Sequence, residues 1–248
     1  MTPIQGLILG LIQGLTEFLP VSSSGHLVIA QNLLKLTEPP VVFDVFVHLA
    51  TALAVVIVIR ETLKNINLDQ IKLILIASIP AGVFGILLNQ KIEELFGSLK
   101  LVGFSLIFTG LILFSTKKIR QGYTLTPKLN PKNSFLIGLA QALAIFPGIS
   151  RSGSTITAGL HQGLTPKDAF NFSFLISLPA IAGAQLLQLN KLGSLSPKEF
   201  PVLAIGCLTA LLSGVFALKL LKRFVVCGKL HFFGYYCFTL GFTILLSL

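Results

Sequence analysis

Two short segments of the chain carry the residue types that phosphate chemistry needs. Residues 10–26 read Gly-Leu-Ile-Gln-Gly-Leu-Thr-Glu-Phe-Leu-Pro-Val-Ser-Ser-Ser-Gly-His, and residues 138–154 read Gly-Leu-Ala-Gln-Ala-Leu-Ala-Ile-Phe-Pro-Gly-Ile-Ser-Arg-Ser-Gly-Ser. Glycines, leucines, a glutamine, a phenylalanine and two serines recur at one constant offset, without a gap. Only the first copy brings Glu17 and His26, and only the second brings Arg151. We therefore expect one site that is assembled from two halves of a duplicated chain.

Each copy is typical of an apolar helix that ends at Pro or Gly, followed by a Ser-x-Ser-Gly turn and a second helix. A serine N-cap explains one or two of the hydroxyls, but it does not explain charged side chains in the same turns. Free N–H groups at a helix N-terminus bind phosphate, and Arg151 adds a bidentate clamp. Glu17 could serve as a metal ligand or a base, and His26 as an acid, base or nucleophile. The pattern predicts a phosphate site.

Asp44 and His48 lie four residues apart, which places them on one face of the next predicted helix. We interpret them as an interfacial pair rather than as part of the site.

The composition indicates an integral membrane protein. Hydrophobic residues make up 53% of the 248 residues and charged residues 11%, whereas soluble domains carry about 25% charged residues. The net charge of +10 is typical of basic loops beside membrane helices. Basic and aromatic residues do not interleave, so we expect no nucleic-acid partner. The three cysteines have no metal or redox spacing.

The apolar runs predict an all-α polytopic membrane protein with an inverted-topology repeat. We expect full spans at residues 41–59, 73–90, 101–116, 170–190, 200–218 and 230–247. Segments 3–36 and 133–166 are broken by Pro, Gly and Ser at their middle, so we expect each to form a re-entrant helical hairpin. A single membrane domain, 1–248, would then comprise a first repeat, 1–128, and a second, inverted repeat, 129–248, each with one hairpin and three transmembrane helices.

The basic residues predict the orientation of this topology. Most Lys and Arg residues fall in the loops of one face, which the positive-inside rule assigns to the cytoplasm. Both termini would then lie on the outer face. The hairpins would enter from opposite faces, so their serine-rich tips would meet near the membrane midplane, as in other inverted repeats with broken helices.

The two motifs resemble those of the undecaprenyl-diphosphate phosphatase (bacitracin-resistance) family, and the resemblance covers essentially the whole chain. Its most specific parts are residues 13–26 and 147–155. The resemblance implies removal of the terminal phosphate from a C55 polyprenyl diphosphate, which regenerates the carrier for cell-wall synthesis. It also implies a homodimer in the bacterial inner membrane, a site reached from the outer face, and a divalent cation, Mg²⁺ or Ca²⁺. Many members have Glu where this chain has Gln13, so Glu17 would be the only carboxylate ligand.

These considerations assign roles to particular side chains. We expect Glu17, His26, Ser23 and Arg151 to be catalytic and Glu17 to hold the metal. The substrate would contact residues of both motifs, namely Gln13, Ser22, Ser24, Gly25, Gly148, Ser150, Ser152, Gly153 and Thr155. Three nucleophiles stay open: His26 itself, Ser23 activated by His26, or water activated by Glu17 and His26.

A different function is compatible with the same features. Inverted repeats with broken helices and a buried arginine also suit a transporter of lipid phosphates or other anions, which would bind the head group at the same turns. Release of phosphate in detergent, where vectorial movement cannot be measured, distinguishes the two functions.

Overall fold

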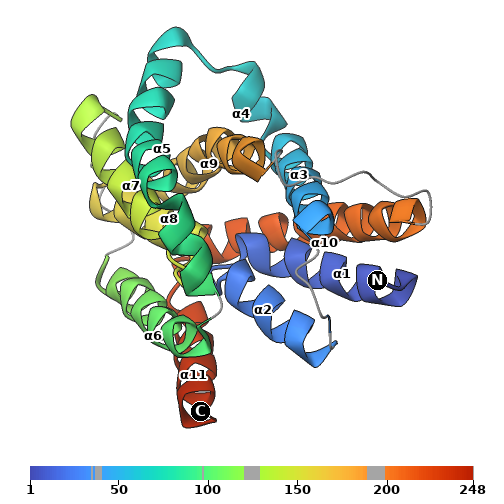
Figure 1. Ribbon diagram of the computed structural model, residues 1–248. Helices are drawn as coiled ribbons and strands as arrows, with labels where there is room; N and C mark the ends of the chain where they lie inside the picture. Colours follow the sequence, from blue (N-terminus) through green and yellow to red (C-terminus); the bar gives the residue numbers. More distant parts are fainter. Residues whose placement is uncertain (35, 37–40, 97, 120–128, 189–198, 248) are drawn as a thin grey trace.

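The computed structural model describes residues 1–34, 36, 41–96, 98–119, 129–188 and 199–247, and every regular element within these ranges is helical (Figure 1). The elements, in chain order, are α1 Pro3–Phe18, α2 Ser23–Leu33, α3 Val41–Val58, α4 Arg60–Lys64, α5 Leu68–Phe96, α6 Leu99–Ser115, the 3₁₀ turn η1 Thr116–Lys118, α7 Pro131–Leu143, α8 Arg151–His161, α9 Pro166–Gln188, α10 Phe200–Val226 and α11 Phe232–Leu246.

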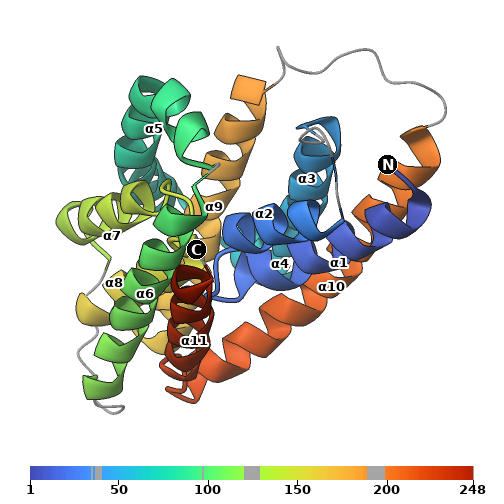
Figure 2. The ribbon, with the colours of Figure 1, turned by 60° about the horizontal axis from the view of Figure 1, so that its bottom comes forward.

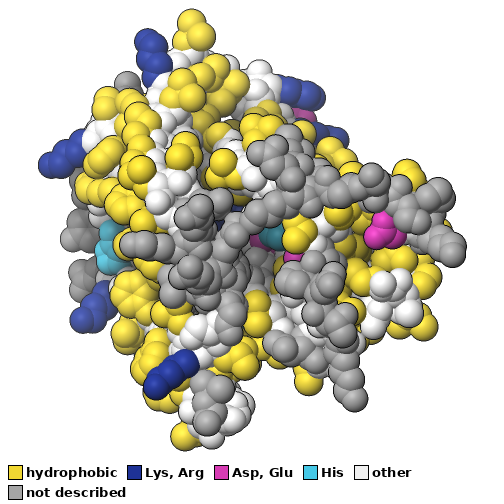
Figure 3. All heavy atoms as spheres, viewed as in Figure 1, with side chains coloured by type: hydrophobic (Ala, Val, Ile, Leu, Met, Phe, Trp, Pro, Cys, Tyr) yellow, Lys and Arg dark blue, Asp and Glu magenta, His cyan; other side chains and the backbone are white. Residues whose placement is uncertain are grey.

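Within the described residues, five helical segments are long and apolar enough to cross a membrane, which agrees with the predicted polytopic architecture. They are Val41–Val58, Leu68–Leu88, Leu99–Lys118, Pro166–Gln188 and Phe200–Val226. The sixth predicted span, 230–247, corresponds to α11, an apolar helix of only 15 residues. Apolar side chains cover much of the outer surface, as a lipid-facing protein requires (Figure 3).

A few of the predicted boundaries cannot be compared with the structure. Residue 35 of the first hairpin, residue 128 at the end of the first repeat, residues 189–190 of one span and residue 248 lie outside the described residues.

The two repeated motifs form matching helix pairs. Helices α1 and α2 have 16 and 11 residues, and α7 and α8 have 13 and 11 residues. Each is shorter than the roughly 20 residues that a membrane-spanning helix needs. Both pairs begin alike: the side chains of Thr2 and Asn130 cap α1 and α7, and each cap is followed by proline. Proline is favoured at the first helical position because its missing N–H would be unpaired there.

The two halves of the chain exchange packing partners. Helix α1 of the first half packs along α10 of the second, and α7 of the second half packs along α5 of the first. Helices α6 and α11, which occupy corresponding places in the two halves, lie side by side (Figure 2). The broken ends of α1 and α7 therefore reach the centre of the molecule from different sides, and the halves cannot separate without exposing both turns.

Glycines let α1 approach α10 closely. A Cβ atom at Gly10 would meet the carbonyl oxygen of Gly206 and the hydroxyl of Thr209. One turn later, a Cβ at Gly14 would meet the hydroxyl of Ser213. Close backbone contact of this kind is a common way to join membrane helices, because packing replaces the hydrophobic effect within lipid. The contact fixes the position of α1, whose last turn carries Glu17.

Substitution of Gly10 by alanine tests this contact. The added methyl group must displace the α10 backbone, and overpacking typically costs about 1–3 kcal/mol. We expect the melting temperature of Gly10→Ala in detergent to fall by at least about 3 °C. Gly82→Ala is the matched control, since its Cβ would meet nothing within 4 Å, and it should melt no lower than the wild type. Equal melting temperatures for the two variants would contradict the proposed contact.

Candidate active site

The turn of the first hairpin is strained at Ser22. Helix α1 ends at Phe18, α2 begins at Ser23, and Ser22 between them has a φ of 66°. A non-glycine residue in this left-handed region costs about 1–3 kcal/mol and persists only where its surroundings hold it. The hydroxyls of Ser22 and Ser24 lie 3.1 Å apart. The strained turn places Ser23 at the N-terminus of α2, facing the end of α1.

The turn of the second hairpin is built differently. Ser150 has an ordinary extended conformation, and its hydroxyl accepts a hydrogen bond from the N–H of Gly153 at 3.1 Å, which caps α8. The positive φ falls on Gly148, at 94°, where glycine adopts it at no steric cost. Thr109 of α6 fastens this turn, because its hydroxyl donates to the carbonyl of Gly148 and accepts from the N–H of Ser150, both at 3.1 Å.

The two turns are in direct contact. The hydroxyl of Ser152 donates to the carbonyl oxygen of Phe18 at 2.7 Å, which satisfies a free carbonyl at the end of α1. The N–H of Gly148 donates to the Ser24 hydroxyl at 3.4 Å. The structure thus joins the motifs whose shared sequence pattern suggested a single site.

Glu17 lies at the centre of this contact. Its Oε2 atom accepts hydrogen bonds from the Ser23 hydroxyl at 2.7 Å and from Nε2 of Gln13 at 3.2 Å. Its Oε1 atom accepts from Nη2 of Arg151 at 2.9 Å. The side chains of Glu17 and Arg151 are only 10% and 15% exposed. One carboxylate therefore links the first turn, its own helix and the second turn.

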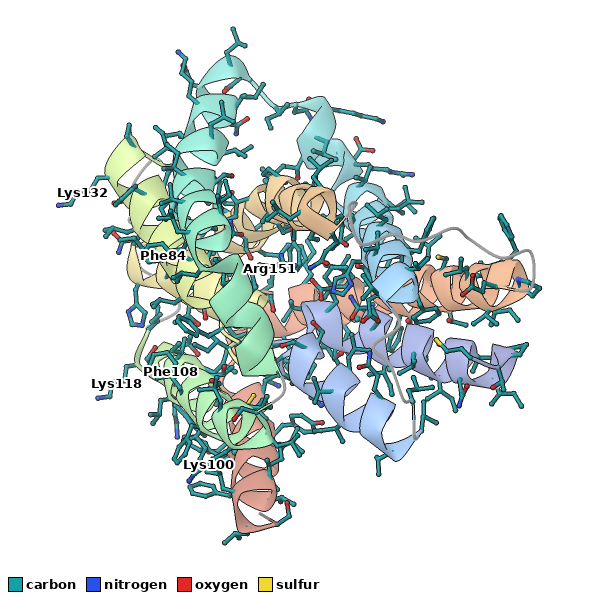
Figure 4. The ribbon with its side chains drawn as sticks, viewed as in Figure 1. Phe84, Lys100, Phe108, Lys118, Lys132 and Arg151 are labelled. Carbon is teal, nitrogen blue, oxygen red and sulfur yellow. The ribbon has the colours of Figure 1, made fainter. Side chains whose placement is uncertain are left out.

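One guanidinium nitrogen of Arg151 has no hydrogen-bond partner among the described residues. This atom, Nη1, is buried, and the guanidinium lies 5.8 Å from the ring centroid of Phe174. Arg151 occupies the middle of the molecule, whereas Lys118 and Lys132 project from the periphery (Figure 4). An unpaired buried guanidinium nitrogen is costly, and an anion would satisfy it.

A pocket beside Arg151 could admit such an anion. Its volume is about 150 Å³. The two turns and the adjoining ends of α1 and α7 supply the lining, which consists of Thr16, Glu17, Ser22, Ser23, Ser24, Ala144, Ile145, Ile149, Ser150 and Arg151. Serine hydroxyls and a guanidinium opposite a carboxylate suit a phosphate group that approaches a nucleophile.

Comparison with known proteins identifies the family. The family model of bacitracin resistance protein BacA matches residues 6–243. The chain belongs to the BacA family. It is 43% identical to an undecaprenyl-diphosphatase of Desulfosudis oleivorans, over 97% of each chain. It is also 41% identical to one of Halothermothrix orenii, over 97% of this chain and 96% of the relative, and 39% identical to one of Methanobrevibacter smithii, over 100% and 98%.

In this BacA-family chain, His26 contacts Ser22 and Tyr236 and not Glu17. Its Nδ1 atom lies 2.7 Å from the carbonyl oxygen of Ser22, and its Nε2 atom lies 2.6 Å from the hydroxyl of Tyr236 on α11. The imidazole and phenol rings are stacked, with centroids 5.7 Å apart. Among the described contacts, none joins the imidazole to Ser23 or Glu17, the two residues with which the sequence associated it.

His48 occupies the place that the sequence suggested for His26. Its Nε2 atom lies 3.8 Å from Oε2 of Glu17, and its Nδ1 atom lies 2.7 Å from the carbonyl oxygen of Asp44. The interpretation of Asp44 and His48 as an interfacial pair missed this approach. Their spacing of four residues placed both on one face of α3, but nothing in the sequence said that this face meets the end of α1.

The remaining predicted binding residues divide into two groups. Ser22, Ser24 and Ser150 line the pocket. Thr155 instead contacts Ser173 of α9, with the hydroxyls 2.6 Å apart. Ser152 and Gly153 pack the two turns together: the Ser152 hydroxyl donates to the carbonyl of Phe18, and a Cβ at Gly153 would lie 3.1 Å from Pro20. Gly25 packs against α6, where its Cβ would lie 3.0 Å from Val102.

The donor set near Glu17 is compatible with a hard divalent cation that is shared with the substrate. Within the described residues, no cluster of three or more His, Cys, Asp or Glu side chains could hold a metal alone. Among the described residues, however, Oε1 of Gln13 is buried and has no hydrogen-bond partner. Mg²⁺ commonly binds through one or two carboxylates, with substrate phosphates and water completing its shell. Glu17 and Gln13 supply a set of that kind.

Substitution of Arg151 by lysine tests the anion pocket. Lysine keeps the charge opposite Glu17 but loses the forked pair of donors. We expect the affinity of purified Arg151→Lys for inorganic pyrophosphate, measured by calorimetry in detergent, to fall at least about tenfold. Lys132→Gln removes a peripheral charge and should bind as the wild type does. If the two variants bind equally well, the pocket is not the anion site.

Proposed function

We propose that this chain hydrolyses undecaprenyl diphosphate to undecaprenyl phosphate and inorganic phosphate, and so recycles the lipid carrier of cell-wall synthesis. The observation that carries the proposal is a pocket lined both by Arg151, which has one guanidinium nitrogen without a partner among the described residues, and by Ser23, whose hydroxyl donates to the carboxylate of Glu17. The names of the relatives agree with it. The polyprenyl tail would lie against the apolar helices, where its burial is favourable.

Arg151 would bind the terminal phosphate through its free nitrogen. The hydroxyls of Ser22, Ser24 and Ser150 line the same pocket and would donate to the remaining phosphate oxygens. As charge spreads over these oxygens in the transition state, fixed donors in a site of low dielectric stabilise it without reorganisation. The N-terminus of α8, which begins at Arg151, adds a favourable partial positive charge.

Ser23 is the nucleophile that the geometry favours over His26. Its hydroxyl already donates to Glu17, so the proton can pass to that carboxylate as the oxygen attacks phosphorus. The new bond joins Oγ of Ser23 to the terminal phosphorus, and the bond to the bridging oxygen breaks, which releases undecaprenyl phosphate. Water then attacks the phosphoserine, and inorganic phosphate leaves as Ser23 recovers its proton.

A divalent cation, Mg²⁺ or Ca²⁺, completes the proposal. Glu17 and Oε1 of Gln13 would hold it together with oxygens of the substrate. When bound, the cation neutralises phosphate charge. Because Gln13 carries no charge, Glu17 is the only negative ligand that the two motifs provide.

The proposal also places the site within the membrane. We propose that α1–α2 and α7–α8 are re-entrant hairpins of two inverted repeats, that both termini lie on the outer face of the inner membrane, and that the pocket opens toward that face. The exchange of partners between the halves supports an inverted repeat. Irregular backbone at membrane depth is tolerated where protein buries it. Assembly as a homodimer stays a prediction from the family resemblance.

Glu17→Gln tests the chemistry with little change of shape. Loss of the proton acceptor should lower phosphate release from undecaprenyl diphosphate in detergent by at least about a hundredfold, and EDTA should abolish release by the wild type. Glu61→Gln is the matched control, because Glu61 is 67% exposed and pairs with Arg60 and Lys64 outside the pocket. Near-normal release by Glu17→Gln would refute the site. A folded wild type that releases no phosphate would instead favour the transporter.

Rapid quenching with substrate labelled in its terminal phosphate tests the nucleophile. We expect acid-stable label on Ser23, identified by mass spectrometry, and no label in Ser23→Ala. Accumulation of the label depends on slow hydrolysis of the phosphoserine, so the quench should be repeated at low temperature. Label on His26 would contradict the assignment, and turnover by Ser23→Ala at the wild-type rate would favour attack by water.

A further inference from the structure

From the contacts of His26 we infer that this histidine is a positioning residue and not a catalytic one, and that Tyr236 completes its support. Both act on the strained turn at Ser22 that places Ser23 against Glu17. The inference rests on the proposed function, since Ser23 is the group that is positioned. It adds a residue of α11, at the far end of the chain, to the machinery of the first hairpin.

The hydrogen bonds of His26 define what its ring can do. A carbonyl oxygen only accepts, so the Nδ1 atom that faces the carbonyl of Ser22 at 2.7 Å must carry a hydrogen. In the neutral ring Nε2 is then an acceptor, and the Tyr236 hydroxyl, 2.6 Å away, is its donor. Both nitrogens are occupied, so His26 offers no free nitrogen toward the pocket.

The carbonyl that His26 holds belongs to the one described non-glycine residue with a positive φ. Ser22 receives both the ring N–H and the backbone N–H of His26, the latter at 3.4 Å. Two donors from the first turn of α2 therefore hold the carbonyl of the strained residue. Such strain needs surroundings that determine it, and the next residue along the chain is Ser23, whose hydroxyl must stay within 2.7 Å of Glu17.

Helix α11 holds the same turn at a second point. Cys237, the neighbour of Tyr236, is buried, and its thiol donates to the carbonyl oxygen of Pro20 at 3.3 Å. Tyr236 and Cys237 thus contact the first hairpin on both sides of Ser22. Helix α11 itself packs along α6, which also fastens the second turn through Thr109. The C-terminal helix is in position to keep the two turns in register.

Adjacent tyrosines provide a matched pair of variants. Tyr235 and Tyr236 are 52% and 47% exposed, but the ring of Tyr235 packs edge-on against Phe114 instead of contacting His26. We expect Tyr236→Phe to lower kcat for phosphate release about tenfold with KM changed less than about twofold, since small misplacement of a reacting group slows the chemical step. Tyr235→Phe should keep the kcat of the wild type. Equal kcat values for the two variants would overturn the role of Tyr236.

His26→Asn separates positioning from catalysis, because asparagine can still donate from its side chain to the carbonyl of Ser22 but cannot act as a base or nucleophile. We expect His26→Asn to keep at least about a tenth of the wild-type kcat and His26→Ala to lose about a hundredfold. Tyr236→Phe should cause no further loss in the His26→Ala background. If His26→Asn is folded and as inactive as His26→Ala, the imidazole acts on the substrate and the inference is wrong.

Nuclear magnetic resonance of protein labelled with ¹⁵N in its four histidines tests the inference without turnover. The His26 signals are assigned by their loss in His26→Asn. We expect a neutral ring with hydrogen on Nδ1, whose Nε2 resonance moves in Tyr236→Phe and stays in place in Tyr235→Phe. Hydrogen on Nε2, or no response to Tyr236→Phe, would overturn the inference even if phosphate release proceeds. Absence of phosphate release by the wild type would count against the proposed function alone.

Discussion

The ion pair between Glu17 and Arg151 is the interaction on which the arrangement of the site depends. It joins side chains separated by 134 positions at 2.9 Å, and both are largely buried in a protein whose surroundings are apolar. Loss of either partner would leave an uncompensated charge, which typically costs about 3–5 kcal/mol. The pair therefore requires that the two turns meet, and the exchange of helix partners between the halves makes that meeting possible.

Two motifs of similar sequence here form an asymmetric site. Both turns keep the serine and glycine framework, but each uses it differently. In the first, the strain lies on Ser22 and its hydroxyl-bearing neighbour Ser23 faces the carboxylate. In the second, Ser150 caps α8 and glycine takes the positive φ. Under the proposed function, one turn presents the nucleophile and the other presents the guanidinium of Arg151 at the N-terminus of α8, which suits transfer of a phosphate group.

The sequence predicted the two motifs whose turns line the pocket. The constant offset between the motifs predicted that the two turns meet, and the charges of Glu17 and Arg151 in apolar segments predicted that both residues belong to the site. The sequence could not predict which neighbouring helix each side chain contacts. His26 faces Tyr236 because α11 lies there, and His48 approaches Glu17 because α3 packs beside the end of α1. These contacts join helices that no motif connects.

The fold shows the same difference between local features, which the sequence predicts, and contacts between helices, which it does not. Five of the six expected spans are helices long and apolar enough to cross a membrane, since apolar length is a local property of the chain. Helix α11 is shorter than expected, and its place beside α6 follows from packing of small residues, such as Gly103 against Gly241. A hydropathy pattern does not report that packing.

The most direct test is an experimental structure with a non-hydrolysable methylene analogue of a polyprenyl diphosphate. The account predicts that the terminal phosphonate lies within hydrogen-bonding distance of the Arg151 guanidinium, with Oγ of Ser23 facing its phosphorus. A head group bound elsewhere, with the Glu17–Arg151 pair intact and the pocket free of the analogue, would contradict it.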